Sequence, residues 1–282
     1  MKTVKLLGTE IKDEEKGNFS EAFADIAYIV RKGHDVCGDS AFIAVDEDKA
    51  VLAVLDGVSG EPDAEQASSV AALAMLNYLK NIESPTQEEI QEAFVTGHSN
   101  IISGFTTAVV VVVQKNGKFI AGSVGDSAFY SIDKDGKIIL EIPPARIVGE
   151  GSPVSSFIPM RNAVPSALGL PGDLNILIKQ GKLENGEIVL LATDAVMDNM
   201  KVKIKDDVVI DSSGIEDLGD IIKGVNEPFQ IVGKVCGEVV KRMAKVTEKK
   251  DKDSILVTKP DDLAVICLRF TGAGKKQKNA KS

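Results

Sequence analysis

Short apolar runs joined by tight-turn residues constrain this chain more than any other feature of its sequence. Residues 106–113 form a β-branched run without polar alternation, which predicts a strand buried on both faces. The pair Asn116-Gly117 then turns the chain into a second strand over 118–124, and an Asp-Gly pair ends a later apolar run in the same way. These hairpin signals predict a largely antiparallel sheet.

Three segments have the periodicity of amphipathic helices. Residues 65–79, 90–101 and 229–243 carry apolar side chains at helical spacing. A last apolar strand is predicted over 263–270. Strands, a helix pair, further strands, a late helix and a final strand indicate an α+β fold rather than a repeated βαβ unit.

The chain reads as one domain with peripheral segments. We expect a single domain over residues 21–271, preceded by an N-terminal extension over 1–20. Residues 143–173 are rich in Gly, Pro and Ser and predict a flap, whereas 201–227 read as a charged insertion. The basic tail over 272–282 is predicted to be disordered.

Composition excludes several classes of protein. The chain has 282 residues, and 42 acidic against 33 basic residues give a net charge of −9, which argues against nucleic-acid and anionic membrane partners. It contains no apolar run of about 20 residues that would span a membrane. Three widely spaced cysteines form no disulfide framework, and with only two histidines they supply no recognisable zinc site. We therefore expect a cytoplasmic protein, with its oligomeric state left open.

Aspartates recur at the ends of the predicted apolar strands. An aspartate in such a place is poorly solvated and repelled by its neighbours unless a cation compensates. The sequence shows no comparable supply of Lys or Arg beside these positions, so it predicts hard divalent ions bound by oxygen. For any single position, a turn-forming role is the simpler interpretation. The positions are Asp39, Asp56, Asp126, Asp194 with Asp198, and Asp261 with Asp262.

Two other motifs carry no function. The tetrapeptide Gly-Asp-Ser-Ala occurs twice and suggests a serine esterase, but no histidine follows late in the chain to act as a base for Ser40 or Ser127. The tail sequence TGAGKK lacks the first glycine and the hydroxyl residue of a phosphate-binding loop.

Seven sequence blocks together resemble the metal-dependent protein phosphatases of the protein phosphatase 2C family, with most similarity to the bacterial regulatory branch. They extend from about residue 24 to residue 270 in the family's order. The blocks are CGDSAF, DGVSGEPDAEQAS, FTTAVVVVV, VGDSAFY, PSALG, LLATDAVMDNM and DDLAVICL.

The resemblance implies a four-layer αββα sandwich with two Mn²⁺ or Mg²⁺ ions at one end of two antiparallel sheets. Asp56 would bridge the two ions, and the carbonyl oxygen of Gly57 would bind one of them. Asp194 and Asp261 would ligate the other ion. Asp39 would hold a metal-bound water.

The resemblance also implies a third, weaker metal site, for which Asp126 and Asp198 match together with Asp194. Many members of the family carry an arginine before the first acidic block that binds the phosphate. In this chain His34 lies near that place and Arg31 lies upstream, so both are candidate phosphate contacts.

Further departures affect the residues around the aspartates. Val58 stands where eukaryotic members have a histidine that acts as general acid. Ala128 replaces the arginine of the GDSR block, and Ala195 replaces the glycine of the SDG block, a mild change if that residue is helical. These departures concern phosphate binding and substrate class more than metal binding.

The implied activity is phosphomonoester hydrolysis by a protein serine/threonine phosphatase that acts on a phosphoprotein in signalling. A binuclear Mn/Mg centre would activate water for this reaction. The absent arginines leave an alternative open, a catalytically weak or inactive phosphatase-like regulatory or binding module. A metal-dependent phosphodiesterase or nuclease would fit the aspartates but not the acidic composition.

Overall fold

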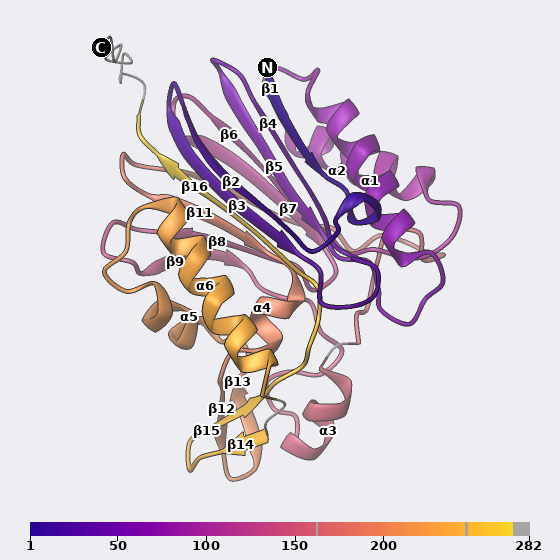
Figure 1. Cartoon of the computed structure of the whole chain (residues 1–282), viewed down its shortest axis with the longest axis vertical. Coiled ribbons are helices and arrows are strands. Elements are labelled where there is room, and N and C mark those ends of the chain that lie inside the picture. The colour runs from indigo at the N-terminus through magenta and orange to yellow at the C-terminus, as the bar shows by residue number, and fades with distance from the viewer. Residues whose placement is uncertain (162, 246–247, 273–282) are drawn as a thin grey trace.

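Two six-stranded sheets form the centre of the protein (Figure 1). The computed structural model describes residues 1–161, 163–245 and 248–272, so the predicted tail lies outside the described residues except for Gly272. Across the first sheet the strands are β1 (Lys2–Leu6), β4 (Ser40–Val45), β5 (Lys49–Leu55), β6 (Ala108–Gln114), β7 (Lys118–Val124) and β10 (Leu177–Lys182). Across the second they are β2 (Glu14–Glu21), β3 (Ala24–Arg31), β16 (Leu263–Phe270), β11 (Ile188–Ala192), β8 (Ala128–Ile132) and β9 (Ile138–Ile142).

Helices cover the outer faces of both sheets. The helices α1 (Ala64–Leu79) and α2 (Gln87–Asn100) pack on the first sheet. The second sheet is covered by α4 (Asp194–Asp198), α5 (Ile215–Ile222) and α6 (Pro228–Met243). This α+β arrangement is the expected four-layer sandwich. Among the described residues, no helix has the length and apolar character needed to cross a membrane.

The central strands are apolar on both sides because each side faces a different core. Leu52 of β5 and Val111 of β6 lie in the core between the two sheets. Their neighbours Val51 and Val110 point to the opposite face and pack under α1 and α2. The uninterrupted valine run is therefore explained by burial on both faces, and every neighbouring pair in the two sheets is antiparallel as expected.

The prediction of an N-terminal extension over residues 1–20 is wrong, because most of these residues belong to the sandwich. β1 pairs with β4 at one edge of the first sheet, and β2 pairs with β3 at one edge of the second. A short 3₁₀ helix, η1 (Gly8–Glu10), connects them. The polar sequence of β2 gives no clear strand signal, because the strand is held only by pairing at the sheet edge and by partial burial.

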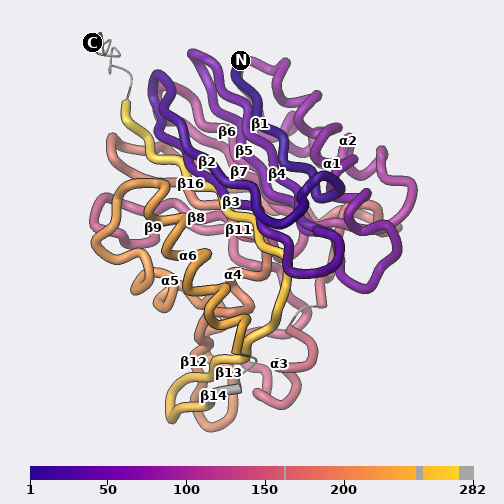
Figure 2. The backbone as a smooth tube through the Cα atoms, in the orientation of Figure 1, coloured from indigo at the N-terminus to yellow at the C-terminus, as the bar shows by residue number. Residues whose placement is uncertain are grey.

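The expected charged insertion is also more ordered than its composition suggests. Residues 201–227 supply β12 (Val202–Lys205), β13 (Val208–Asp211) and α5. With β14 (Glu248–Lys250) and β15 (Ser254–Val257), the two strands form a third sheet that lies apart from the N-terminus in Figure 2.

The flap packs on this third sheet through a small core of its own. The expected flap over 143–173 contains one helix, α3 (Val154–Met160). Phe157 of that helix is buried with Ile204, Val209 and Ile255 of the third sheet. The flap and the charged segment therefore form one structural unit beside the sandwich.

We predict that Leu6→Ala destabilises the protein by about 2–4 kcal/mol. Leu6 is buried in the core between the sheets, so its truncation leaves a cavity. The neighbouring Lys5 is exposed, and Lys5→Ala should change stability by less than about 0.5 kcal/mol. Urea unfolding of both variants measures the difference. Equal, small effects would mean that the N-terminal strand is dispensable.

Candidate metal centre

Antiparallel pairing brings the predicted aspartates to one end of both sheets. Neighbouring strands run in opposite directions, so the end of one strand lies beside the start of the next. In the first sheet Leu55 pairs with Ser40, and in the second Ala192 pairs with both Ala128 and Val265. Asp39 and Asp56 directly flank the first pair, and Asp126, Asp194 and Asp261 lie two to four positions beyond the others. The cluster consists of Asp39, Asp56, Asp126, Asp194, Asp198 and Asp261, none more than 9% exposed.

Burial and mutual repulsion disfavour the charged form of this cluster. Desolvation is the main cause that raises the pKa of each of the six carboxyl groups. The pKa of Asp56 is raised further by the charges of Asp194, Asp39, Asp261 and Asp126. Such groups can all be ionised together only if cations bind between them and neutralise their charge.

The Asp-Gly and Thr-Thr blocks fix the centre of the cluster. The carbonyl oxygen of Asp56 accepts hydrogen bonds from the Thr107 amide and the Thr106 hydroxyl, both at 2.8 Å. A Cβ on Gly57 would lie 2.5 Å from the carbonyl oxygen of Ala64, so only glycine fits there. These contacts hold the backbone of Asp56 and Gly57 at the end of β5.

Asp39 joins the two sheets at the cluster. Its Oδ2 accepts a hydrogen bond of 2.8 Å from the hydroxyl of Thr193, which directly precedes Asp194. The Thr193 amide donates in turn to the carbonyl oxygen of Ala264 in β16. Asp39 is therefore held in a fixed orientation beside the start of α4.

Asp261 and Asp262 have different roles, although they are adjacent. The Asp262 carboxylate accepts hydrogen bonds from the amides of Gly33, His34 and Gly38, at 2.6, 3.2 and 2.7 Å. These bonds tie the loop before β4 to the start of β16. The Asp261 carboxyl instead interacts with Asp194, whose charge raises its pKa, so Asp261 remains the metal-ligand candidate of the pair.

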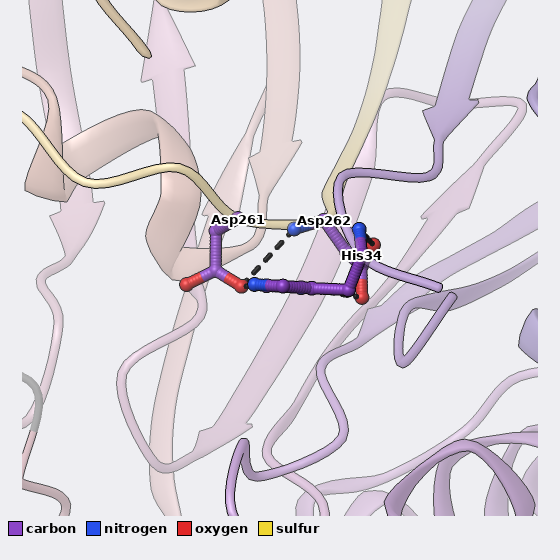
Figure 3. A group of neighbouring side chains, drawn as sticks. All are labelled: His34, Asp261 and Asp262. Carbon is purple, nitrogen blue, oxygen red and sulfur yellow. Dashed lines mark hydrogen bonds and ion pairs between the residues drawn. The ribbon is translucent and has the colours of Figure 1, made fainter. Parts of the chain in front are cut away.

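His34 lies beside Asp261 and Asp262 (Figure 3). Its Nδ1 is 3.4 Å from Asp262 Oδ2 and 3.7 Å from Asp261 Oδ1, and its side chain is 47% exposed. One ligand atom from each of these three residues lies within 4.8 Å of the others, but Asp262 is already engaged by the backbone. Arg31, the other candidate phosphate contact, forms an ion pair of 3.3 Å with Glu14 instead.

The expectation that basic residues are lacking beside the aspartates is wrong. Arg146 Nη2 lies 2.7 Å from Asp198 Oδ1 in an ion pair whose side chains are 4% and 2% exposed. Lys259 Nζ lies 2.5 Å from Asp261 Oδ2 and 3.9 Å from Asp194 Oδ2. Arg146 could not be found from sequence because it is distant from its partner in the chain. Lys259 stands two residues before Asp261, and that proximity was the available signal.

A cavity of about 260 Å³ opens onto the cluster. Its floor is acidic, and Val164 of the flap contributes to its wall. Carboxylate oxygens form the donor set here, without sulfur, which fits Mn²⁺ or Mg²⁺ rather than a softer metal. The lining residues are Asp56, Val58, Ser59, Thr107, Asp126, Val164, Asp194 and Lys259.

Comparison with known proteins identifies the family of the chain. The sequence profile of the family described as Protein phosphatase 2C matches residues 30–212. The chain belongs to the protein phosphatase 2C family. The match contains all the clustered aspartates except Asp261, which lies beyond it. Proteins of this family are metal-dependent phosphatases that act on phosphoproteins, so membership places the chain in the hydrolase class.

Individual relatives and structural neighbours are distant in sequence. The 5-azacytidine resistance protein azr1 of Schizosaccharomyces pombe is 26% identical over 224 residues, covering 73% of this chain and 70% of that protein. The photosystem II phosphatase PBCP has a TM-score of 0.66 at 18% identity, covering 87% of this chain and 98% of that one. The serine/threonine phosphatase PstP of Mycobacterium tuberculosis has a TM-score of 0.60 at 16% identity, covering 88% and 99%. RsbX, solved in complex with magnesium, has a TM-score of 0.58 at 15% identity, covering 91% and 100%.

Two of the departures from the protein phosphatase 2C motifs are accommodated by packing. Ala195 lies within helix α4, a conformation that requires no glycine. Ala128 is fully buried in the core under α6, where an arginine would have to leave the core to reach solvent. Neither change disturbs the backbone that carries the aspartates.

We predict that Arg146→Met destabilises the metal-free protein by about 3–5 kcal/mol, because it leaves Asp198 buried without this partner. The double variant Arg146→Met/Asp198→Asn should recover most of the loss, since both charges are removed. Urea unfolding in EDTA measures both variants. Stability of the single variant within about 0.5 kcal/mol of wild type would contradict the ion pair.

The raised carboxyl pKa values predict that the metal-free protein loses stability as the pH rises. The pKa of Asp261 increases from 3.8 to about 6, mainly through burial and the charge of Asp194. Its contribution is fully present below about pH 4 and is lost as the pH rises through about 6, a change of about 3 kcal/mol. Urea unfolding in EDTA from about pH 4 to 7 should show a steeper fall for wild type than for Asp261→Asn. Parallel profiles would contradict this prediction.

Proposed function

We propose that this chain is a protein serine/threonine phosphatase in which two Mn²⁺ or Mg²⁺ ions activate water to hydrolyse a phosphomonoester. One observation carries the proposal: buried aspartates from both sheets converge at one end of a protein phosphatase 2C sandwich, where their charges repel. Divalent ions would relieve that repulsion. Family membership supports the hydrolase class, and the substrate and the number of ions are part of the proposal.

The residues that would hold the ions are arranged along the strand ends. Asp56 would be a ligand of both ions, and the Gly57 carbonyl oxygen would be a further ligand of one. Asp194 and Asp261 would ligate the other. Bound ions would lower the pKa of a water and neutralise phosphate oxygens. Asp39, oriented by the Thr193 hydroxyl, would accept a hydrogen bond from the attacking water.

Direct attack by water fits the nucleophiles that the chain contains. The Ser40 hydroxyl accepts a hydrogen bond from the Gly8 amide, and the Ser127 hydroxyl pairs with Thr107 at 2.7 Å, so both serines have structural roles. Cys37 is buried, and desolvation raises the pKa of its thiol. These groups are poorly suited to form a phospho-enzyme.

The structure also guides the roles proposed for the third metal site and for the candidate phosphate contacts. Asp198 is engaged by Arg146, so a third ion would depend mainly on Asp126 and Asp194. His34 beside Asp261 is a candidate phosphate contact, whereas Arg31 pairs with Glu14 and is given no role. The phosphoprotein chain would lie across the flap, whose Val164 lines the cavity, and across the third sheet on which the flap packs.

The alternative is a phosphatase-like module that binds a partner without turnover. The ion pairs of Arg146 and Lys259 favour it, because the chain's own cations already neutralise part of the cluster. A hydrolysis assay separates this module from the enzyme.

We predict that Asp56→Asn and Asp194→Asn each lower Mn²⁺-dependent hydrolysis of p-nitrophenyl phosphate and of a phosphothreonine peptide by about 1,000-fold. Each removes several kcal/mol of metal-derived stabilisation of the transition state. Asp135→Asn, at an exposed hairpin, is the matched control and should keep full activity. Hydrolysis that persists in EDTA would contradict the mechanism. An inert wild type that still binds Mn²⁺ would favour the binding module.

A further inference from the structure

Lys259 occupies the position between two carboxylates that the proposed function assigns to one ion. Its ammonium lies 2.5 Å from Asp261 Oδ2 and 3.9 Å from Asp194 Oδ2. An ion ligated by both carboxylates would meet this ammonium, and like charges at such a distance repel strongly in a buried site. The ammonium and the ion therefore compete for the same oxygens.

The backbone of Lys259 is fixed while its side chain can move. The Lys259 amide donates to Asn199 Oδ1, and its carbonyl oxygen accepts from Asn199 Nδ2, both at 3.0 Å. Asn199 is fully buried directly after α4, the helix that begins with Asp194. The lysine side chain is 26% exposed and ends in a point charge on a flexible stem. Displacement of the ammonium requires rotamer changes and no backbone movement.

A displaced Lys259 ammonium remains beside the cavity into which a phosphate group would enter. Among the described residues that line this cavity, Lys259 alone carries a positive charge, against three aspartates. A phosphate dianion requires cationic partners in such surroundings. Arg31 is not among the residues that line the cavity and pairs with Glu14 instead.

We propose that Lys259 is a movable cation that pairs with Asp261 and Asp194 in the metal-free protein and binds the substrate's phosphate group once an ion has displaced it. This proposal rests on the proposed function, because the ion and the phosphate are those of that reaction. It assigns to this chain a phosphate-binding residue on the segment between β15 and β16.

The test measures two affinities of opposite expected change. Lys259→Met should bind Mn²⁺ about tenfold more tightly in calorimetry, because the competing charge is gone. The Mn²⁺-loaded variant should bind inorganic phosphate about tenfold more weakly, measured by calorimetry and by product inhibition. Lys259→Arg should restore phosphate binding. Lys182→Met, at an exposed lysine paired with Glu184, is the control and should change neither affinity.

The outcomes separate this proposal from the proposed function. A variant that merely disturbs the fold would weaken both affinities, so Lys259→Met with weaker Mn²⁺ binding overturns the proposal. Unchanged Mn²⁺ and phosphate affinities also overturn it, and leave the phosphatase intact if wild type still hydrolyses p-nitrophenyl phosphate. A wild type that binds no Mn²⁺ defeats the proposed function, and the proposal about Lys259 fails with it.

Discussion

Desolvation and mutual repulsion of the clustered aspartates shape the end of the sandwich where the strands of both sheets meet. Antiparallel pairing places the aspartate-bearing strand ends side by side, and none of the clustered aspartates is more than 9% exposed. The carboxyl pKa values are raised because it is unfavourable to ionise buried groups that repel one another. A sandwich with this cluster needs cations to balance its charge. The surrounding loops contribute basic side chains and leave an opening through which metal ions can enter.

Two of these cations belong to the chain. Arg146 comes from the flap and is buried against Asp198, so it acts as a fixed counter-charge. Lys259 follows the third sheet and its side chain is partly exposed to solvent. A divalent ion would therefore be able to displace its ammonium from the carboxylates. The segments that look peripheral in sequence thus contribute directly to the electrostatics of the centre. Divalent ions would complete the neutralisation and add the ability to activate water.

Features of the fold that are encoded by short stretches of contiguous residues could be predicted from the sequence. The hairpins, the three amphipathic helices and the acidic strand ends could be read because each is encoded by contiguous residues, and the ordered blocks identified the fold. Features stabilised by tertiary contacts were missed. Strand β2 is polar and is held by edge pairing, and the third sheet depends on a core shared with Phe157 of the flap. The pairing of Arg146 with Asp198 spans 52 residues, a separation over which sequence patterns carry no signal.

We propose that the aspartate cluster holds two ions that activate water. Anomalous diffraction at the manganese edge, from crystals grown with Mn²⁺, tests whether both ions are present. We expect two peaks about 3.5–4 Å apart, with Asp56 between them and with Asp194 and Asp261 bound to one of them. We also expect that Lys259 Nζ has left Asp261. A cluster without anomalous density, in which Lys259 still pairs with Asp261 at saturating Mn²⁺, would contradict the proposal.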